Sequence, residues 1–127
     1  MEQNNSQITE PVTGMETVLE GFNELAEELG MDEEIKVDLL QSFVERCRGF
    51  LEILETTVDG QEADMFERTT HSLKGLAGNM RFVKLGGLNE NFTQAVQAGD
   101  KEQATLFLRE MWEEFQQIKE AIAPLTQ

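Results

Sequence analysis

The sequence predicts an all-α protein, an antiparallel four-helix bundle with an additional short N-terminal helix covering one end. Beyond residue 12, nearly every stretch repeats its apolar residues with the period of an α-helix, and almost none alternates as a strand would. Short breaks at Gly30, Asp59-Gly60 and Gly99-Asp100 divide this pattern into amphipathic segments. Helices joined by such short connections pack antiparallel to their neighbours, and 127 residues suit one domain.

The chain is expected to begin with a flexible tail over residues 1–12, which are polar, contain Pro11 and lack periodicity. The helical domain then covers residues 13–124. Its first helix starts near Thr13, because Thr13 and Glu16 have the spacing of a capping box. Gly30 suits the position just past the end of this helix. The inward stripe consists of Met15, Val18, Phe22, Leu25 and Leu29.

The second helix is long and has clear signals at both ends. Asp32 can cap its start, and Asp59-Gly60 breaks it. Its buried side is expected to contain Leu40, Phe43, Val44, Cys47, Phe50, Leu51, Leu54 and Val58.

The last two helices are separated by the turn at residues 99–100. The fourth helix runs from about Lys84 to Ala98, and Asp100 with Gln103 forms a capping arrangement for the last helix. Pro124 lies just beyond the end of that helix. The expected inward residues are Leu85, Leu88, Phe92 and Ala95, followed by Ala104, Phe107, Leu108, Met111, Phe115, Ile118 and Ile122.

Composition excludes several classes of function. A net charge of −15 would repel nucleic acid and anionic membrane surfaces, so neither is an expected partner. No apolar run is long enough to span a bilayer and no secretory signal is present, which predicts a cytoplasmic protein. With one cysteine, Cys47, and one histidine, an internal disulfide and a Cys/His metal site are not expected.

The third helix, expected over roughly residues 61–81, carries that single histidine, His71. At 100° per residue, an apolar cluster forms the core face on the far side of the helix from His71: Phe66, Thr69, Leu73, Leu76 and Met80. Four residues fall within about 40° of His71, namely Asp64, Gly75, Gly78 and Phe82. Arg68 and Lys74 lie about 60° to either side. The pattern therefore predicts that His71 projects outward.

Two glycines on this outward face need an explanation. Each glycine inside a helix costs about 1 kcal/mol of stability relative to alanine. Because the packing face lies on the opposite side, Gly75 and Gly78 are better explained by a partner that must approach the backbone beside the imidazole.

The residue types on this face favour phosphoryl transfer. An imidazole is largely neutral and nucleophilic at physiological pH, and it can attack phosphorus to form a covalent intermediate. Lys74, three positions further on, can meet the developing phosphoryl charge.

The segment HSLKG (residues 71–75) resembles the signature of histidine-containing phosphotransfer (HPt) domains of two-component phosphorelays. The wider segment THSLKGLAGNM (residues 70–80) and the helix order resemble that family over about residues 15–122. The resemblance implies a histidine, matched here by His71, that accepts phosphate from a receiver-domain aspartate and passes it to another. It also implies charge stabilisation by Lys74 and receiver docking at Gly75.

The resemblance further implies that the receiver supplies Mg²⁺, so this chain needs no cofactor or metal of its own. Family members often have small residues at the positions of Leu76, Arg81 and Phe82, and a supporting polar side chain near Thr93, Gln94 and Gln97. These departures from the family pattern affect which partner docks and how it docks, more than the basic chemistry. The predicted partner-binding residues are Asp64, Glu67, Arg68, Gly75, Gly78 and Phe82.

The predicted function is a stand-alone phosphoryl carrier between receiver domains or from a sensor or hybrid histidine kinase, without kinase activity of its own. It is expected to be a monomer. One alternative is the phosphotransfer domain of a chemotaxis-type kinase. The other is a helical adaptor that binds a receiver or kinase without carrying phosphate.

Overall fold

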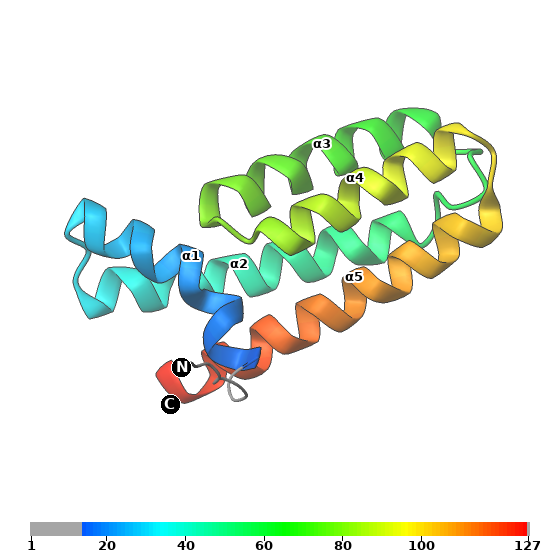
Figure 1. Ribbon diagram of the computed structural model, residues 1–127. Coiled ribbons are helices and arrows are strands. Elements are labelled where there is room, and N and C mark those ends of the chain that lie inside the picture. The colour runs from blue at the N-terminus through cyan, green and yellow to red at the C-terminus, as the bar shows by residue number, and fades with distance from the viewer. Residues whose placement is uncertain (1–13, 127) are drawn as a thin grey trace, which may run out of the picture.

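The computed structural model describes residues 14–126 and contains no strand within them (Figure 1). Five α-helices follow one another: α1 (Gly14–Leu29), α2 (Glu33–Leu54), α3 (Ala63–Met80), α4 (Val83–Gln97) and α5 (Lys101–Ile122). A short 3₁₀ helix over Ala123–Leu125 ends the described chain. The predicted all-helical class is confirmed, whereas the predicted tail and the capping residue Thr13 lie outside the described residues.

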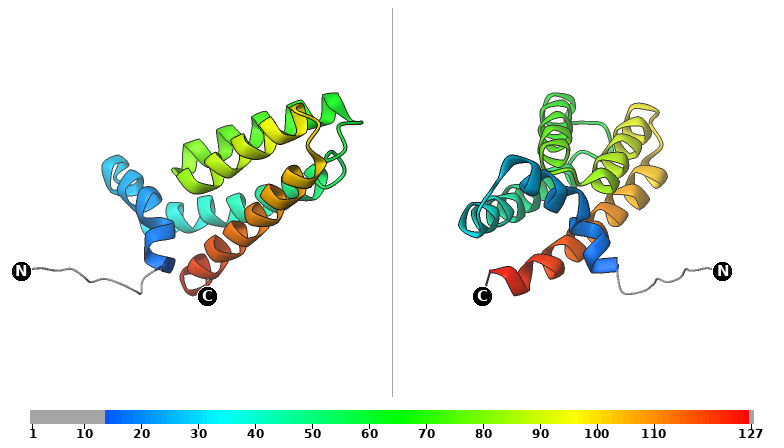
Figure 2. Two further views of the ribbon diagram at one scale, coloured as in Figure 1. Left: turned by 45° about the vertical axis from the view of Figure 1, so that its right-hand side comes forward. Right: turned by 60° about the vertical axis from the view of Figure 1, so that its left-hand side comes forward.

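The helices form a bundle around one apolar core. α2 packs against α3 and α5, and α4 packs against the same two helices, so these four enclose the core between them. α1 contacts α5 and α3 and lies across one end of the bundle (Figures 1 and 2). Met15 belongs to the predicted inward set, but its side chain lies outside the described part of the structure. Of the others, all but Leu29 are buried or half-buried.

Two of the predicted helix starts are confirmed by their caps. The Asp32 carboxylate accepts a hydrogen bond of 2.9 Å from the backbone N–H of Ile35. The Asp100 carboxylate accepts one of 3.1 Å from the backbone N–H of Gln103. Each cap satisfies a helical N–H group that has no partner within its own helix.

Leu29 is a correction to the predicted inward stripe, because 65% of it is exposed. It is the last residue of α1, and Gly30 follows with a left-handed backbone (φ 66°). The last turn of α1 extends past the bundle (Figure 1), so the side chain of Leu29 has no core surface to cover.

Close contact between α1 and the loop after α3 depends on Gly21. A Cβ atom at this position would lie 2.6 Å from the carbonyl oxygen of Arg81. Arg81 also forms a two-armed ion pair with Glu28 of α1, at 3.0 and 3.3 Å. This pairing lowers the pKa of the Glu28 carboxyl through the hydrogen bonds and the positive charge of Arg81. α1 is therefore fixed to the bundle by backbone contact and by charge.

Gly21→Ala is expected to destabilise the protein by about 1–3 kcal/mol, because the new methyl group must displace backbone rather than a flexible side chain. Gly49→Ala is the matched control, since a Cβ atom on this α2 residue would meet nothing within 4 Å. The control should gain about 0.5–1 kcal/mol from helix propensity. Urea unfolding measures the free energy of unfolding of both variants. Equal stabilities would contradict the close contact between Gly21 and the Arg81 carbonyl.

No helix within residues 14–126 has both the length and the apolar character that a membrane crossing requires.

Candidate functional site

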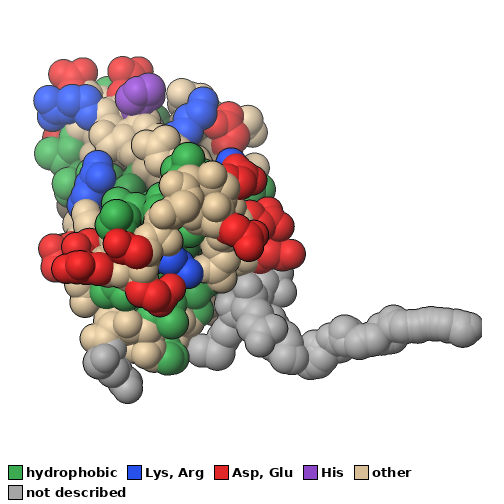
Figure 3. Space-filling model, turned by 90° about the vertical axis from the view of Figure 1, so that its left-hand side faces the viewer, with side chains coloured by type: hydrophobic (Ala, Val, Ile, Leu, Met, Phe, Trp, Pro, Cys, Tyr) green, Lys and Arg blue, Asp and Glu red, His purple; other side chains and the backbone are tan. Residues whose placement is uncertain are grey.

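The site is built on the middle of α3, whose two sides differ sharply in burial. The side that faces the core buries Phe66, Thr69, Thr70, Leu73, Leu76, Ala77 and Met80. His71 is exposed on the opposite side, as the periodicity predicts. Figure 3 shows this histidine, in purple, protruding at the edge of the molecule with basic side chains on both sides. Its imidazole is therefore accessible to a partner.

The predicted neighbours of His71 are exposed on the same helix, with one exception. The exposed ones are Asp64, Glu67, Arg68, Lys74, Gly75 and Gly78. Among the residues that the structure describes, neither His71 nor Lys74 takes part in an ion pair or in a side-chain hydrogen bond. The Lys74 ammonium group is thus available to an incoming anion next to the imidazole.

Gly75 and Gly78 lie in open space. A Cβ atom built on either residue would meet nothing within 4 Å. Packing within the described chain therefore does not require either glycine, although each weakens the helix. What the two glycines provide is a strip of bare backbone beside His71, over which another molecule can approach closely.

Phe82 is the exception, and it corrects the predicted docking surface. Only 3% of it is exposed, and its ring packs against Phe43 at 4.7 Å and Phe22 at 6.4 Å between centroids. The prediction ended the helix near residue 81 and placed Phe82 by continuing the helical spacing one residue further, but α3 ends at Met80 and Arg81 adopts a left-handed backbone (φ 59°). This residue reverses the chain and turns Phe82 into the core.

Phe82→Ala is therefore expected to destabilise the fold by about 3–5 kcal/mol, because it removes a ring from a packed aromatic cluster. Val83→Ala, on the next residue, is the control: 82% of Val83 is exposed, so its truncation should leave stability nearly unchanged. Thermal and urea unfolding measure both. A Phe82→Ala variant with native stability would restore the original prediction.

Sequence reasoning missed Asn89 on α4. It is 3% exposed among apolar neighbours, and its amide donates a 2.9 Å hydrogen bond to the carbonyl of Thr70, the residue before His71. A polar residue on the inward stripe of this helix was the available signal. The Thr93 hydroxyl instead donates to the backbone carbonyl of Asn89, at 2.8 Å. The Gln94 amide donates to Glu90, so the described contacts of these two residues do not include His71.

Cys47 is no competing nucleophile. It is fully buried in α2, and burial raises the pKa of its thiol to about 12. The reactive thiolate is therefore scarce at neutral pH.

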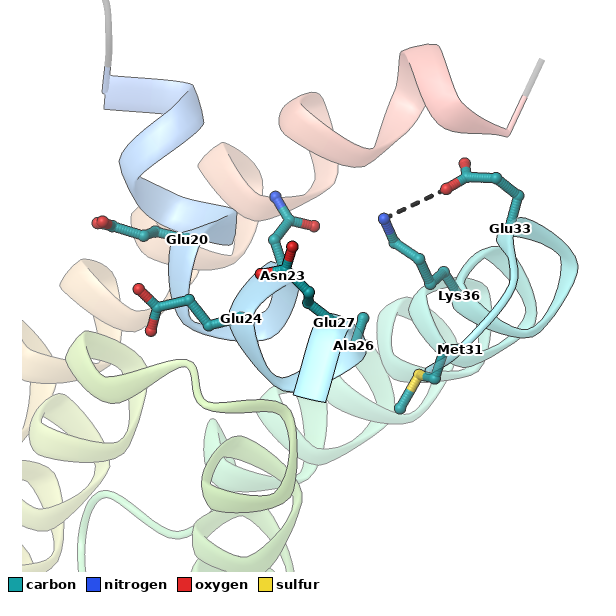
Figure 4. A pocket seen from close by; sticks show the side chains of 8 residues that line it. All are labelled: Glu20, Asn23, Glu24, Ala26, Glu27, Met31, Glu33 and Lys36. Carbon is teal, nitrogen blue, oxygen red and sulfur yellow. Dashed lines mark ion pairs between the residues drawn. The ribbon is translucent and has the colours of Figure 1, made fainter. Parts of the chain in front are cut away.

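A pocket of about 680 Å³ lies elsewhere, between α1 and the start of α2 (Figure 4). Half of its lining residues are glutamates, and its one lysine, Lys36, is paired with Glu33 at 3.3 Å. No residue of α3 lines it. Among residues 14–126, no group of three or more His, Cys, Asp or Glu side chains is arranged to hold a metal ion.

Comparison with models of known protein families assigns the chain to a family independently of the structure. The model of a family described as the Hpt domain matches residues 38–123, from the second turn of α2 to just past the end of α5. No curated protein and no solved structure matches the chain.

Proposed function

Because the chain belongs to the Hpt domain family, whose members carry phosphoryl groups in two-component phosphorelays, we propose that it carries such a group on His71. The partners are receiver domains and a sensor or hybrid histidine kinase. The observation that supports this role is the exposed imidazole of His71 beside the open backbone at Gly75 and beside Lys74, which has no ion-pair partner within residues 14–126. Residues 13–124 form the functional unit, with α2 to α5 as an antiparallel four-helix bundle.

The transfer step is a substitution at phosphorus. The lone pair of a ring nitrogen of His71 attacks the phosphorus atom of a receiver's aspartyl phosphate. The N–P bond forms while the bond between phosphorus and the aspartyl oxygen breaks, and the aspartate carboxylate leaves with that electron pair. The proton on the other ring nitrogen stays in place, so no base from this chain is needed. The reverse step passes the phosphoryl group to a second aspartate.

Lys74 stabilises the charge that accumulates on the phosphoryl oxygens. It lies one helical turn from His71, at a spacing that brings two side chains on a helix together. Its exposure weakens this attraction in the free protein. A docked receiver excludes water from the site and strengthens the attraction, since charges interact more strongly at low dielectric. The Mg²⁺ ion belongs to the receiver, and this chain contributes no metal ligand.

Direct labelling tests the proposal. A set of receiver domains is phosphorylated with ³²P-labelled acetyl phosphate and Mg²⁺ and then mixed with the protein. Labelled phosphoramidate, which can phosphorylate an exposed imidazole and release ammonia, serves as a second donor that needs no cognate receiver. The expected product is labile in acid and stable in base. This lability indicates a phosphorus–nitrogen bond, and because His71 is the only histidine in the chain, loss of the label in His71→Gln identifies the residue.

The same experiment separates the alternatives. A helical adaptor would bind receiver domains without acquiring label from either donor, and that result would refute the proposed function. A phosphotransfer domain of a chemotaxis-type kinase would acquire label and also accept phosphate from a kinase ATP-binding domain supplied in trans.

A further inference from the structure

Asn89 is a buried polar residue whose presence the fold does not require. It lies on α4 among Leu85, Leu88 and Phe92, all of which are buried. Its amide nitrogen donates one hydrogen bond to α3, but its Oδ1 atom is buried and has no hydrogen-bond partner among the described residues. A buried acceptor left unpaired costs more free energy than one hydrogen bond returns. An apolar residue of similar size would therefore suit the core at least as well.

Within the described part of the chain, the side chain of Asn89 makes one hydrogen bond, and it joins the turn of α3 that contains His71. Its acceptor is the carbonyl oxygen of Thr70, at 2.9 Å. In an α-helix this carbonyl also accepts the N–H group four residues later, which here belongs to Lys74. The turn that Asn89 holds thus begins directly before His71 and ends at Lys74, and it contains both groups that the transfer step uses.

Contacts one turn before and one turn after Asn89 show how this part of α4 lies against α3. The Thr93 hydroxyl donates to the backbone carbonyl of Asn89 at 2.8 Å, one turn further along α4. One turn earlier, a Cβ atom on Gly86 would lie 3.9 Å from the Cβ atom of Ala77, so the two helices are close there. Asn89 therefore meets α3 at the height of His71, where the two helices lie close together.

We propose that Asn89 is a positioning residue for phosphotransfer: its amide fixes the His71–Lys74 turn against α4, so that a docked receiver meets the imidazole in one geometry. The inference rests on the proposed function of His71. Misplacement of a reacting group by about 1 Å is enough to slow an enzymatic step by up to about 100-fold. A positioning role also explains why the protein keeps the buried Asn89 although its unpaired oxygen lowers stability.

The test compares Asn89→Leu with the matched control Asn91→Leu, an exposed asparagine about 160° away around α4. Each protein is loaded with phosphoramidate, and its loss of label to a receiver domain is followed over a range of receiver concentrations. Asn89→Leu should melt at the same temperature as the parent or higher, and it should load with phosphoramidate at the parent rate. Its maximal transfer rate should fall by about 10-fold with an unchanged half-saturating receiver concentration. Asn91→Leu should match the parent throughout.

Other results would overturn the inference. A folded Asn89→Leu variant with the parent's maximal rate would show that Asn89 serves packing alone. A change confined to the half-saturating concentration would assign it to docking instead. If the leucine variant fails to fold, Asn89→Ala is measured in the same way and must show the same loss of maximal rate. Absence of label on the parent protein would refute the role of His71 itself, which separates the two failures.

Discussion

His71→Gln is expected to reduce the acid-labile, base-stable label to background with both donors. Glutamine keeps a polar side chain on the exposed face of α3 but has no nucleophilic nitrogen, because its amide lone pair is delocalised. Since His71 is exposed and makes no contact that the fold needs, the variant should retain the helical content and unfolding midpoint of the parent.

Ser72→Ala is the matched control for this substitution. Ser72 is exposed at the next position of the same helix, whereas the hydroxyl on the other side of His71 belongs to Thr70, which is buried. Its variant should be labelled as the parent is, since a hydroxyl is not the acceptor. Label that survives in His71→Gln and is lost in Ser72→Ala would move the site to the serine. Phosphate on a serine is stable in acid, whereas phosphate on a histidine is not, so acid treatment would distinguish the two sites.

Gly75→Phe is expected to abolish transfer from receiver domains while leaving the protein folded. The bulky ring would stand on the exposed backbone beside His71 and keep a receiver from approaching. Within the chain the ring has room, because a Cβ atom there meets nothing within 4 Å. Loss of the glycine should even strengthen α3 slightly. Labelling by phosphoramidate, a small donor, should persist, and this separates blocked docking from a damaged nucleophile.

Gly87→Phe provides the control, since Gly87 is likewise helical, exposed and free of neighbours within 4 Å. Gly86 faces Ala77 of α3, so Gly87 points about 100° further around α4, away from α3. This variant should exchange phosphate at nearly the parent rate. Circular dichroism and urea unfolding check both proteins. If Gly75→Phe unfolds, or if both variants lose transfer equally, the docking role of Gly75 is wrong.

Periodicity was enough to predict the helices and the orientation of α3, because long amphipathic segments must bury one face. It also placed His71, Lys74 and the two glycines together, since helical spacing is regular. It failed at Phe82, where the left-handed backbone of Arg81 ends that regularity. It failed again at Leu29, since the pattern marks a stripe as apolar but does not say where the partner helix ends. The inward position of Asn89 could be found in this way, but its role could not, because that role depends on which α3 carbonyl it meets.

If His71 carries a phosphoryl group as proposed, its position along α3 affects how firmly that group is held. The residue lies roughly two turns from either end of the helix. The partial charges of a helix act mainly within its first and last turns, so at this point the positive and negative ends largely offset each other. An anion bound here gains no stabilisation from amide dipoles of the kind that cradle phosphate at helix N-termini. In the proposed role, the ends of α3 would therefore contribute little to holding the phosphoryl group, and Lys74 would be a nearby cation of this helix left to stabilise it.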